Sequence, residues 1–273
     1  AANPVRREQS FMSLFYNLCS SSSGNATFVG DREGGLLFDA GVGIRNFSKW
    51  LLAQGLTPDS VRGIFLTHEH SDHIKGASVI AKRHRIPIYG SEDTIRCLLD
   101  TGRLSGEEEI HIIRRETHLD GFLVTAVPTS HDSPGSVCYR VDTPDGKSVG
   151  ICTDLGYVSP MILELMSGCD HLLLESNYDE DMLKNGPYPY YLKKRIASKN
   201  GHLSNNQCAE AIGRLIALGT RSFSLGHLSE HNNLPDLAYD TSCGYLSLLG
   251  MHEGRDYSLE VLGKVNDGKA VNL

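Results

Sequence analysis

The feature that most constrains this chain is a dense group of imidazole and carboxylate side chains between a predicted strand and a predicted helix. Three histidines and one aspartate fall in the segment His68-Glu69-His70-Ser71-Asp72-His73, directly after the apolar run VRGIFLT. Side chains two residues apart at a strand end point the same way, so His68 and His70 can share one ion. Asp72 and His73, where the chain turns into the helix, would project toward a second position. Imidazole with carboxylate suits zinc, manganese or iron, so the segment predicts a metal site.

The rest of the sequence alternates short apolar runs with longer amphipathic stretches, a pattern typical of mixed β-sheets covered by helices. It predicts an α/β fold with strands at 26–30, 35–39, 61–67, 86–89, 110–114, 121–127, 136–142, 147–152, 171–175, 221–226 and 257–262. It predicts helices at 44–54, 74–85, 92–101, 159–167, 204–218 and 234–248. Asp72 is expected to cap the second of these helices and Ser204 the fifth.

The chain is expected to form one domain over residues 12–273, because no internal repeat divides it. Residues 1–11 do not share the alternating pattern and are expected to be an added or disordered end. The stretch at 186–200 is rich in Pro, Gly and Lys, and we interpret it as an insertion because apolar segments resume on both sides.

Composition excludes some function classes. A formal charge of −7 argues against binding nucleic acid by bulk positive charge, so a phosphate-rich substrate would need a local attraction. No apolar run approaches the about 20 residues of a membrane helix, and the start has no apolar leader segment. We therefore expect a cytoplasmic protein without membrane association.

The seven cysteines, with no CxxC pair, are expected to be reduced thiols.

The pattern His68-x-His70-x-Asp72-His73 resembles the signature of the metallo-β-lactamase superfamily. Its other motifs stand in order at Leu37-Phe38-Asp39-Ala40-Gly41, Thr129-Ser130-His131-Asp132, Cys152-Thr153-Asp154-Leu155-Gly156 and Gly226-His227-Leu228-Ser229. The resemblance extends from about residue 13 to the C-terminus. It implies a four-layer αββα sandwich, in which helices flank two mixed sheets.

The resemblance also implies two divalent cations, zinc or manganese, with iron as a further option. One cation would bind His68, His70 and His131. The other would bind Asp72, His73 and His227, and Asp154 would be shared. Asp39 would hydrogen-bond to one of the ligands and fix its orientation. The alternative for Asp39 is a turn former at a strand end.

Two further segments are similar to the RNase Z side of the superfamily, namely Leu174-Glu175-Ser176-Asn177 and Gly201-His202-Leu203-Ser204. There a Glu orients a His that relays a proton to the leaving group, which implies this role for Glu175 and His202. His202 could instead only decorate a helix start, and His231 is a rival proton donor. Asp72 completes the set of predicted catalytic residues.

The segment Ser20-Ser21-Ser22-Ser23-Gly24-Asn25 resembles the YycJ/WalJ group of the superfamily, which is associated with nuclease activity on DNA. Two other segments carry the same resemblance, Glu175 to Tyr178 and His227 to Asn232. Its implied substrate contacts are Ser21, Ser22, Ser23, Asn25, Tyr178 and Asn232. A small-residue turn can bind phosphate, although the serine loop could equally be an ordinary flexible turn. The sequence has no long tRNA-holding arm and no separate cap domain, which argues against tRNA 3′ trailers as substrate.

Basic clusters lie at 82–85, 114–115 and 193–195, and such clusters are more often solvated helix faces than grooves. The last lies beside Tyr188, Tyr190 and Tyr191, and aromatic rings among cations can stack unpaired bases.

Together these features predict a dinuclear metal-dependent hydrolase, a phosphodiesterase of the DNA exonuclease type. The hypothesis is attack by a metal-bridged hydroxide, with His202 protonating the leaving oxygen. One alternative is a thioester or lactone hydrolase of the same fold, which would share every metal ligand. The other alternative is a binding module without activity. Against it, this chain has a metal-binding residue type at all seven predicted ligand positions.

Overall fold

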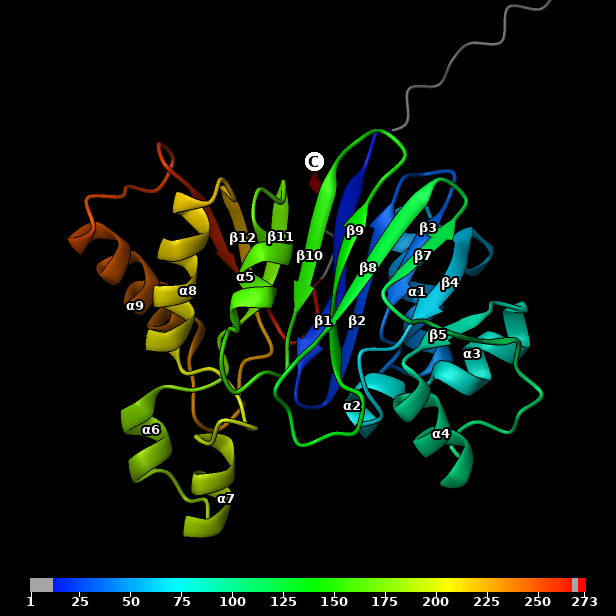
Figure 1. Cartoon of the computed structure of the whole chain (residues 1–273), viewed down its shortest axis with the longest axis horizontal. Coiled ribbons are helices and arrows are strands. Elements are labelled where there is room, and N and C mark those ends of the chain that lie inside the picture. The colour runs from blue at the N-terminus through cyan, green and yellow to red at the C-terminus, as the bar shows by residue number, and fades with distance from the viewer. Residues whose placement is uncertain (1–11, 267–269) are drawn as a thin grey trace, which may run out of the picture.

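Two seven-stranded mixed sheets pack face to face in the described part of the chain, and helices cover both outer faces (Figure 1). The computed structural model describes residues 12–266 and 270–273. The α/β fold class and the four-layer αββα arrangement are therefore confirmed. The expectation for residues 1–11 lies outside the described residues.

The first sheet joins antiparallel strands at one edge to parallel strands at the other. In spatial order it contains β14 (Val271–Asn272), β1 (Leu14–Ser21), β2 (Gly24–Gly30), β3 (Gly35–Phe38), β4 (Val61–Phe65), β5 (Ile88–Gly90) and β6 (Ile110–Ile112). Strands β3 to β6 run parallel, so their carboxyl ends lie at the same edge of the sheet.

The second sheet has the same mixed character. In spatial order it contains β13 (Ser258–Val261), β12 (Ser222–Gly226), β11 (His171–Glu175), β10 (Ser148–Cys152), β9 (Val137–Asp142), β8 (Phe122–Pro128) and β7 (Glu116–Leu119). Strands β10 to β13 are parallel, and their carboxyl ends also share an edge.

Helices bury their apolar faces against the outer side of each sheet. On the first sheet lie α1 (Ile44–Ala53), α2 (Ser71–Ile74), α3 (Ala77–His84) and α4 (Glu92–Asp100), with a short 3₁₀ turn at Pro58–Ser60. On the second lie α5 (Pro160–Met166), α8 (Asn205–Ala217) and α9 (Pro235–Leu248). Two more, α6 (Glu180–Asn185) and α7 (Tyr190–Ile196), project from the lower left of Figure 1. None of the helices within the described ranges is long and apolar enough to span a bilayer.

The two predicted helix caps have different outcomes. Ser204 caps α8, and its hydroxyl accepts from the Gln207 backbone N–H while the Gln207 side chain accepts from Ser204. The prediction for Asp72 is wrong, because α2 begins at Ser71 and its cap residue is His70. The Asp72 carboxylate instead lies 3.4 Å from a ring nitrogen of His73. The seven cysteines are free thiols, as expected.

The layer between the sheets is packed with aromatic rings. Phe65 on β4 is fully buried and stacks on Tyr89, with ring centres 4.5 Å apart. Its ring also contacts Phe38 at 5.4 Å and Tyr139 on the opposite sheet at 5.9 Å. This packing holds the end of β4, and therefore the histidine segment after it, in a fixed position.

Replacing Phe65 with alanine should lower the free energy of unfolding by about 3–5 kcal/mol, because it removes a buried ring and leaves a cavity. Urea denaturation of both proteins measures the difference. Leu52→Ala, at a 60% exposed position on α1, is the matched control and should change stability by about 0.5 kcal/mol or less. Equal effects of the two substitutions would contradict this account of the core.

A buried histidine also lies between the sheets. His171 on β11 lies against Phe15, with ring centres 4.4 Å apart, and its two ring nitrogens bond to Ser222 at 2.8 Å and Ser224 at 2.9 Å. Burial lowers the pKa of His171 from 6.5 to about 4, because the charged ring would lose its hydration.

Stability should therefore fall as pH falls from 6.5 toward 4, because the unfolded chain then binds a proton that the folded chain does not. His171→Gln removes this titration, so the wild type should lose up to about 3 kcal/mol more than the variant over that range. Urea denaturation of both proteins at several pH values measures the two slopes. Parallel curves would show that His171 is not held neutral by the fold.

Candidate metal centre

Loops at one end of both sheets bring the predicted ligands together. His68 and His70 follow β4, and His131 follows β8. Asp154 follows β10 and His227 follows β12. Residues far apart in the sequence therefore meet because the strands that precede them end at the same edge of the sandwich.

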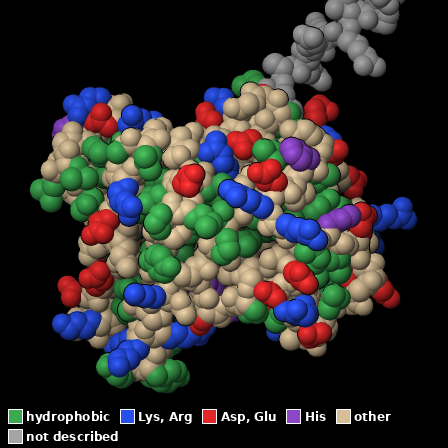
Figure 2. All heavy atoms as spheres, in the orientation of Figure 1, with side chains coloured by type: hydrophobic (Ala, Val, Ile, Leu, Met, Phe, Trp, Pro, Cys, Tyr) green, Lys and Arg blue, Asp and Glu red, His purple; other side chains and the backbone are tan. Residues whose placement is uncertain are grey.

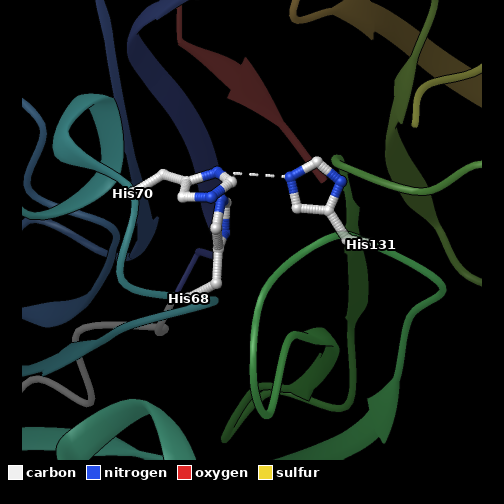
Figure 3. A group of neighbouring side chains, drawn as sticks. All are labelled: His68, His70 and His131. Atoms are coloured by element: carbon white, nitrogen blue, oxygen red, sulfur yellow. Dashed lines mark hydrogen bonds between the residues drawn. The ribbon is translucent and has the colours of Figure 1, made fainter. Parts of the chain in front are cut away.

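His68, His70 and His131 form the first cluster (Figure 3), in which one ring nitrogen of each lies within 4.8 Å of the others. The Nδ1 of His70 faces the Nε2 of His131 at 3.3 Å. The His131 Nδ1–H donates to the carbonyl oxygen of Gly201 at 3.2 Å, so the Nε2 lone pair of a neutral His131 points toward His70. This arrangement suits a cation between the rings.

Asp72, His73 and His227 form the second cluster. Asp72 Oδ2 lies 3.4 Å from the Nε2 of His73 and 3.5 Å from the Nε2 of His227. Asn25 bonds to the same His73 nitrogen at 3.1 Å. Two imidazoles and a carboxylate thus converge beside the first cluster.

Asp154 lies between the two clusters. Its Oδ1 is 3.8 Å from the Nε2 of His131, and its Oδ2 is 3.2 Å from the Nε2 of His73. The carboxylate is buried, and the charges of His227 and His73 outweigh desolvation and hold its pKa well below 3.8. Asp154 is therefore an anion in contact with both clusters.

Two buried atoms of this site test whether a metal fits. Among the described residues, neither His68 Nε2 nor Asp154 Oδ2 has a hydrogen-bond partner. Buried polar atoms left in this way are costly unless something else satisfies them. Burial and the charge of His73 hold the pKa of His68 well below 6.5, which favours the neutral ring that binds metals. The donor set therefore fits divalent cations.

Asp39 and Thr67 orient the histidines from behind. Asp39 Oδ2 accepts from the Nδ1–H of His73 at 2.8 Å, which leaves Nε2 directed into the site. Thr67 donates through both its backbone N–H and its hydroxyl to Asp39, and its hydroxyl lies 3.0 Å from His68 Nδ1. Thr67 thus links two histidines to one carboxylate.

Glu175 is fully buried at the end of β11, on the second sheet, where it orients two histidines as Asp39 orients His73. Its Oε1 accepts from His202 Nδ1 at 2.9 Å and from His227 Nδ1 at 2.7 Å. The backbone N–H groups of Asp154, Leu155 and Leu203 also donate to it. Desolvation opposes ionisation, but the charge of His202 and these hydrogen bonds lower the pKa of Glu175 to about 2.

Three site residues have left-handed backbone conformations, which side chains other than glycine rarely adopt. They are Asp39 (φ 59°), Asp154 (φ 59°) and His227 (φ 56°). Each comes directly after a strand or one residue beyond it, where the chain must turn sharply. Such strained positions cluster at functional sites, where the surrounding structure holds them.

A pocket of about 230 Å³ opens over both clusters. Ser22, Asn177, His202 and Arg195 contribute to its wall. His202 lies beside His131 and His227, with ring centres 5.1 and 5.4 Å away.

The other predicted residues lie outside this wall. Ser21 and Ser23 line a neighbouring pocket, Tyr178 lines a groove beside α6, and Asn232 is fully buried. Asn25 contacts the predicted ligands His73 and Asp72, and the exposed His231 lies against Tyr188.

Thr67, Asn177 and Gly201 also belong to the site, although their place in it was not predicted. Asn177 donates to the carbonyl oxygen of His227 at 2.7 Å. Only Thr67 could have been predicted from the sequence, because a hydroxyl directly before a predicted histidine ligand at a strand end can bond to it. The role of Gly201 depends on a backbone carbonyl, which carries no sequence signal.

Comparisons with known proteins agree with this geometry. Residues 35–227 match the family described as the beta-lactamase superfamily domain. The chain is 33% identical over 246 residues to "Exodeoxyribonuclease WalJ" of Streptococcus pneumoniae, covering 89% of this chain and 91% of that protein. It is 34% identical over 226 residues to "Exodeoxyribonuclease YycJ" of Bacillus anthracis, covering 82% and 85%.

A solved structure shares the fold. The metallo-beta-lactamase fold protein YhfI from Bacillus subtilis superposes with a TM-score of 0.71 at 16% identity, over 96% of this chain and 99% of that one. On the family match and these two relatives, the chain belongs to the beta-lactamase superfamily, on its metallo-β-lactamase-fold side and near the WalJ and YycJ proteins.

Proposed function

We propose that this protein is a metal-dependent hydrolase that cleaves phosphodiester bonds in nucleic acid, with DNA as substrate and an exonuclease mode of action. The observation that carries the proposal is the hydrogen-bonded pair Glu175–His202 beside two adjacent ligand clusters. Similarity over most of the chain to two proteins named exodeoxyribonucleases supports DNA as substrate.

Two divalent cations would bind here, one at His68, His70 and His131 and one at Asp72, His73 and His227, with Asp154 between them. The mixed nitrogen and oxygen ligands suit zinc or manganese, and iron as a further option. Bound cations supply Lewis acidity, which lowers the pKa of coordinated water and neutralises charge on phosphate oxygens. They would also offset part of the formal charge of −7 where the substrate binds.

His202 is suited to protonate the leaving oxygen. Its Nδ1 is held by Glu175, so its Nε2 is the atom available to a substrate in the pocket. Burial lowers the pKa of His202, but the charge and hydrogen bond of Glu175 outweigh it and raise the pKa above 6.5. This shift favours the protonated ring, the form that a general acid requires.

The neighbouring residues would position the substrate. Ser22 lines the pocket, and the turn from Ser21 to Ser23 could offer hydroxyl and backbone N–H groups to a phosphate. His231, the rival proton donor, is exposed and packs against Tyr188 at 5.8 Å. His202 lines the pocket and His231 does not, so His202 is the better placed proton donor.

Asp154→Ala should abolish cleavage of end-labelled DNA in manganese or zinc, because it removes the carboxylate that contacts both clusters. The assay follows labelled single- and double-stranded oligonucleotides, with bound metal measured by elemental analysis. Asp240→Ala, at an exposed position on α9, is the matched control and should retain full activity. Undiminished cleavage by Asp154→Ala would overturn the metal assignment.

Cleavage of an acyl-thioester but of no oligonucleotide by the wild type would favour the small-molecule alternative.

His202→Ala should lower kcat by about 10²–10⁴ while the bound metal stays unchanged, since only the proton donor is lost. Wild-type kcat should also fall as pH rises above the pKa of His202, and the variant should lack this alkaline limb. His231→Ala serves as the comparison and should change kcat little. Loss of metal from His202→Ala would instead indicate a structural role for this histidine.

A further inference from the structure

The insertion between Glu175 and His202 carries a helix with two different faces. Leu192, Arg195 and Ile196 of α7 line the candidate active-site pocket together with Tyr188 just before the helix. Residues three and four apart on a helix share a face, so Tyr190, Lys193 and Lys194 lie on the other side. That outer face lines a separate groove of about 460 Å³ between α6 and α7.

The outer groove combines an apolar floor with a basic rim. Tyr178, Leu183 and Ala197 contribute apolar surface. Lys184, Lys193 and Lys194 contribute positive charge against the single acidic residue of the lining, Glu180. The Nζ of Lys194 lies 5.0 Å from the centre of the Tyr190 ring. The groove therefore offers both a surface for a flat ring and cations for an anion beside it.

Exposure of the aromatic rings on α7 is unusual for side chains of their size. Tyr190 is 71% exposed and Tyr191 is 73% exposed, and α7 has no buried residue. Figure 2 shows Lys and Arg side chains close to apolar ones at the lower left of the molecule, where Figure 1 places α7. Core packing does not account for these rings, because they contribute little to any buried layer.

The local charge is opposite to that of the whole chain. Residues 184–199 contain five basic residues and no acidic one. The whole arm, residues 178–201, also contains Asp179, Glu180 and Asp181, so its formal charge is +2 while the protein carries −7 overall. One of the five, Arg195, is paired with Asp132 and so anchors the inner face of α7 next to His131. Lys184, Lys193 and Lys194 line the outer groove and place positive charge there. A polyanion is therefore attracted to this arm and not to the surface at large.

We propose that the α6–α7 arm, residues 178–201, binds the single-stranded part of a DNA substrate beside the cleavage site. Bases would stack on Tyr190 and Tyr191 and enter the outer groove, while Lys184 and Lys194 contact the phosphates. Stacking accepts any base, so the binding is independent of sequence but requires unpaired bases. Because the inner face of α7 lines the active-site pocket, a strand held on the arm leads directly to it. This inference rests on the proposed function for its link to cleavage.

The test is a pair of substitutions, Tyr190→Ala with Tyr191→Ala, measured by fluorescence anisotropy with a labelled 20-nucleotide single strand. The pair should weaken binding at least tenfold and raise KM for that strand similarly, because stacking on both rings is lost. Hydrolysis of bis(p-nitrophenyl) phosphate, which is too small to reach the arm, should not change.

Two control variants accompany this test. Tyr190→Phe with Tyr191→Phe keeps the rings and should bind like the wild type. Leu248→Ala with Leu249→Ala removes two exposed apolar side chains at the C-terminal end of α9 and serves as the matched control.

Charge contacts are tested separately by Lys194→Gln. The slope of log binding constant against log salt should become shallower by about 0.7, the value for one phosphate contact on a single strand. Wild-type affinity of the alanine pair for the 20-nucleotide strand would overturn the proposed stacking, and a wild-type salt slope for Lys194→Gln would overturn the proposed phosphate contact. An equal loss of affinity for a blunt duplex would also overturn it, because paired bases cannot stack on the rings. Anisotropy needs no cleavage, so a protein that binds the strand through these tyrosines but cuts no DNA would refute the proposed function alone.

Discussion

The site depends on three buried carboxylates, Asp39, Asp154 and Glu175, at the end where both sheets meet. Burying a carboxylate away from water is costly unless hydrogen bonds or opposite charges compensate for it. Here Asp39 accepts from Thr67 and His73, and Glu175 accepts from two histidines and three backbone N–H groups. In His73 and His227, which donate in this way through Nδ1, the Nε2 atom faces Asp72. The orientation of the ligand rings is thus a consequence of how the fold neutralises its own buried charges.

The strand ends supply the second requirement, which is a sharp change in chain direction. Asp39, Asp154 and His227 adopt positive φ values of 56–59° directly after β-strands or one residue beyond them. The backbone bonds around them compensate for this strain, since the N–H of Asp39 donates to Phe65 and the N–H of His227 donates to Ser20. Both partners belong to strands of the first sheet or their ends. The bond of Asp39 lies within the first sheet, whereas the bond of His227 joins the second sheet to the first. Strand ends of both sheets therefore hold conformations that an isolated loop would not maintain.

Local pattern was sufficient for most elements of the fold, and contacts distant in sequence account for the errors. The predicted helix at 74–85 is divided into α2 and α3 near Gly76, where a Cβ would lie 1.9 Å from the carbonyl oxygen of Val42. Strand β1 was not predicted, because its serines and asparagine indicate a loop, yet pairing with β2 and β14 buries it throughout. The insertion at 186–200 was predicted, but the helix α7 within it was not. None of the residues of α7 is buried, so the helix has no clear apolar periodicity in the sequence. The spacing of the predicted ligands was visible in the sequence because it depends on the identity of side chains. The contact of His131 with the Gly201 carbonyl and that of Glu175 with His227 depend on the folded backbone, so the sequence did not predict them.

The arm and the metal centre are coupled through close backbone contacts. A Cβ at Gly156 would lie 2.2 Å from the carbonyl oxygen of Lys199, and one at Gly201 would lie 2.0 Å from that of Ile196. The end of the arm is thus packed against the turn that follows Asp154, at positions where only glycine fits without displacement. The same short segment supplies the carbonyl that orients His131 and leads directly into His202. Any movement of α7 relative to the body would be transmitted to His131 and His202 together. For this reason the insertion is better understood as part of the candidate site than as an appendage to it.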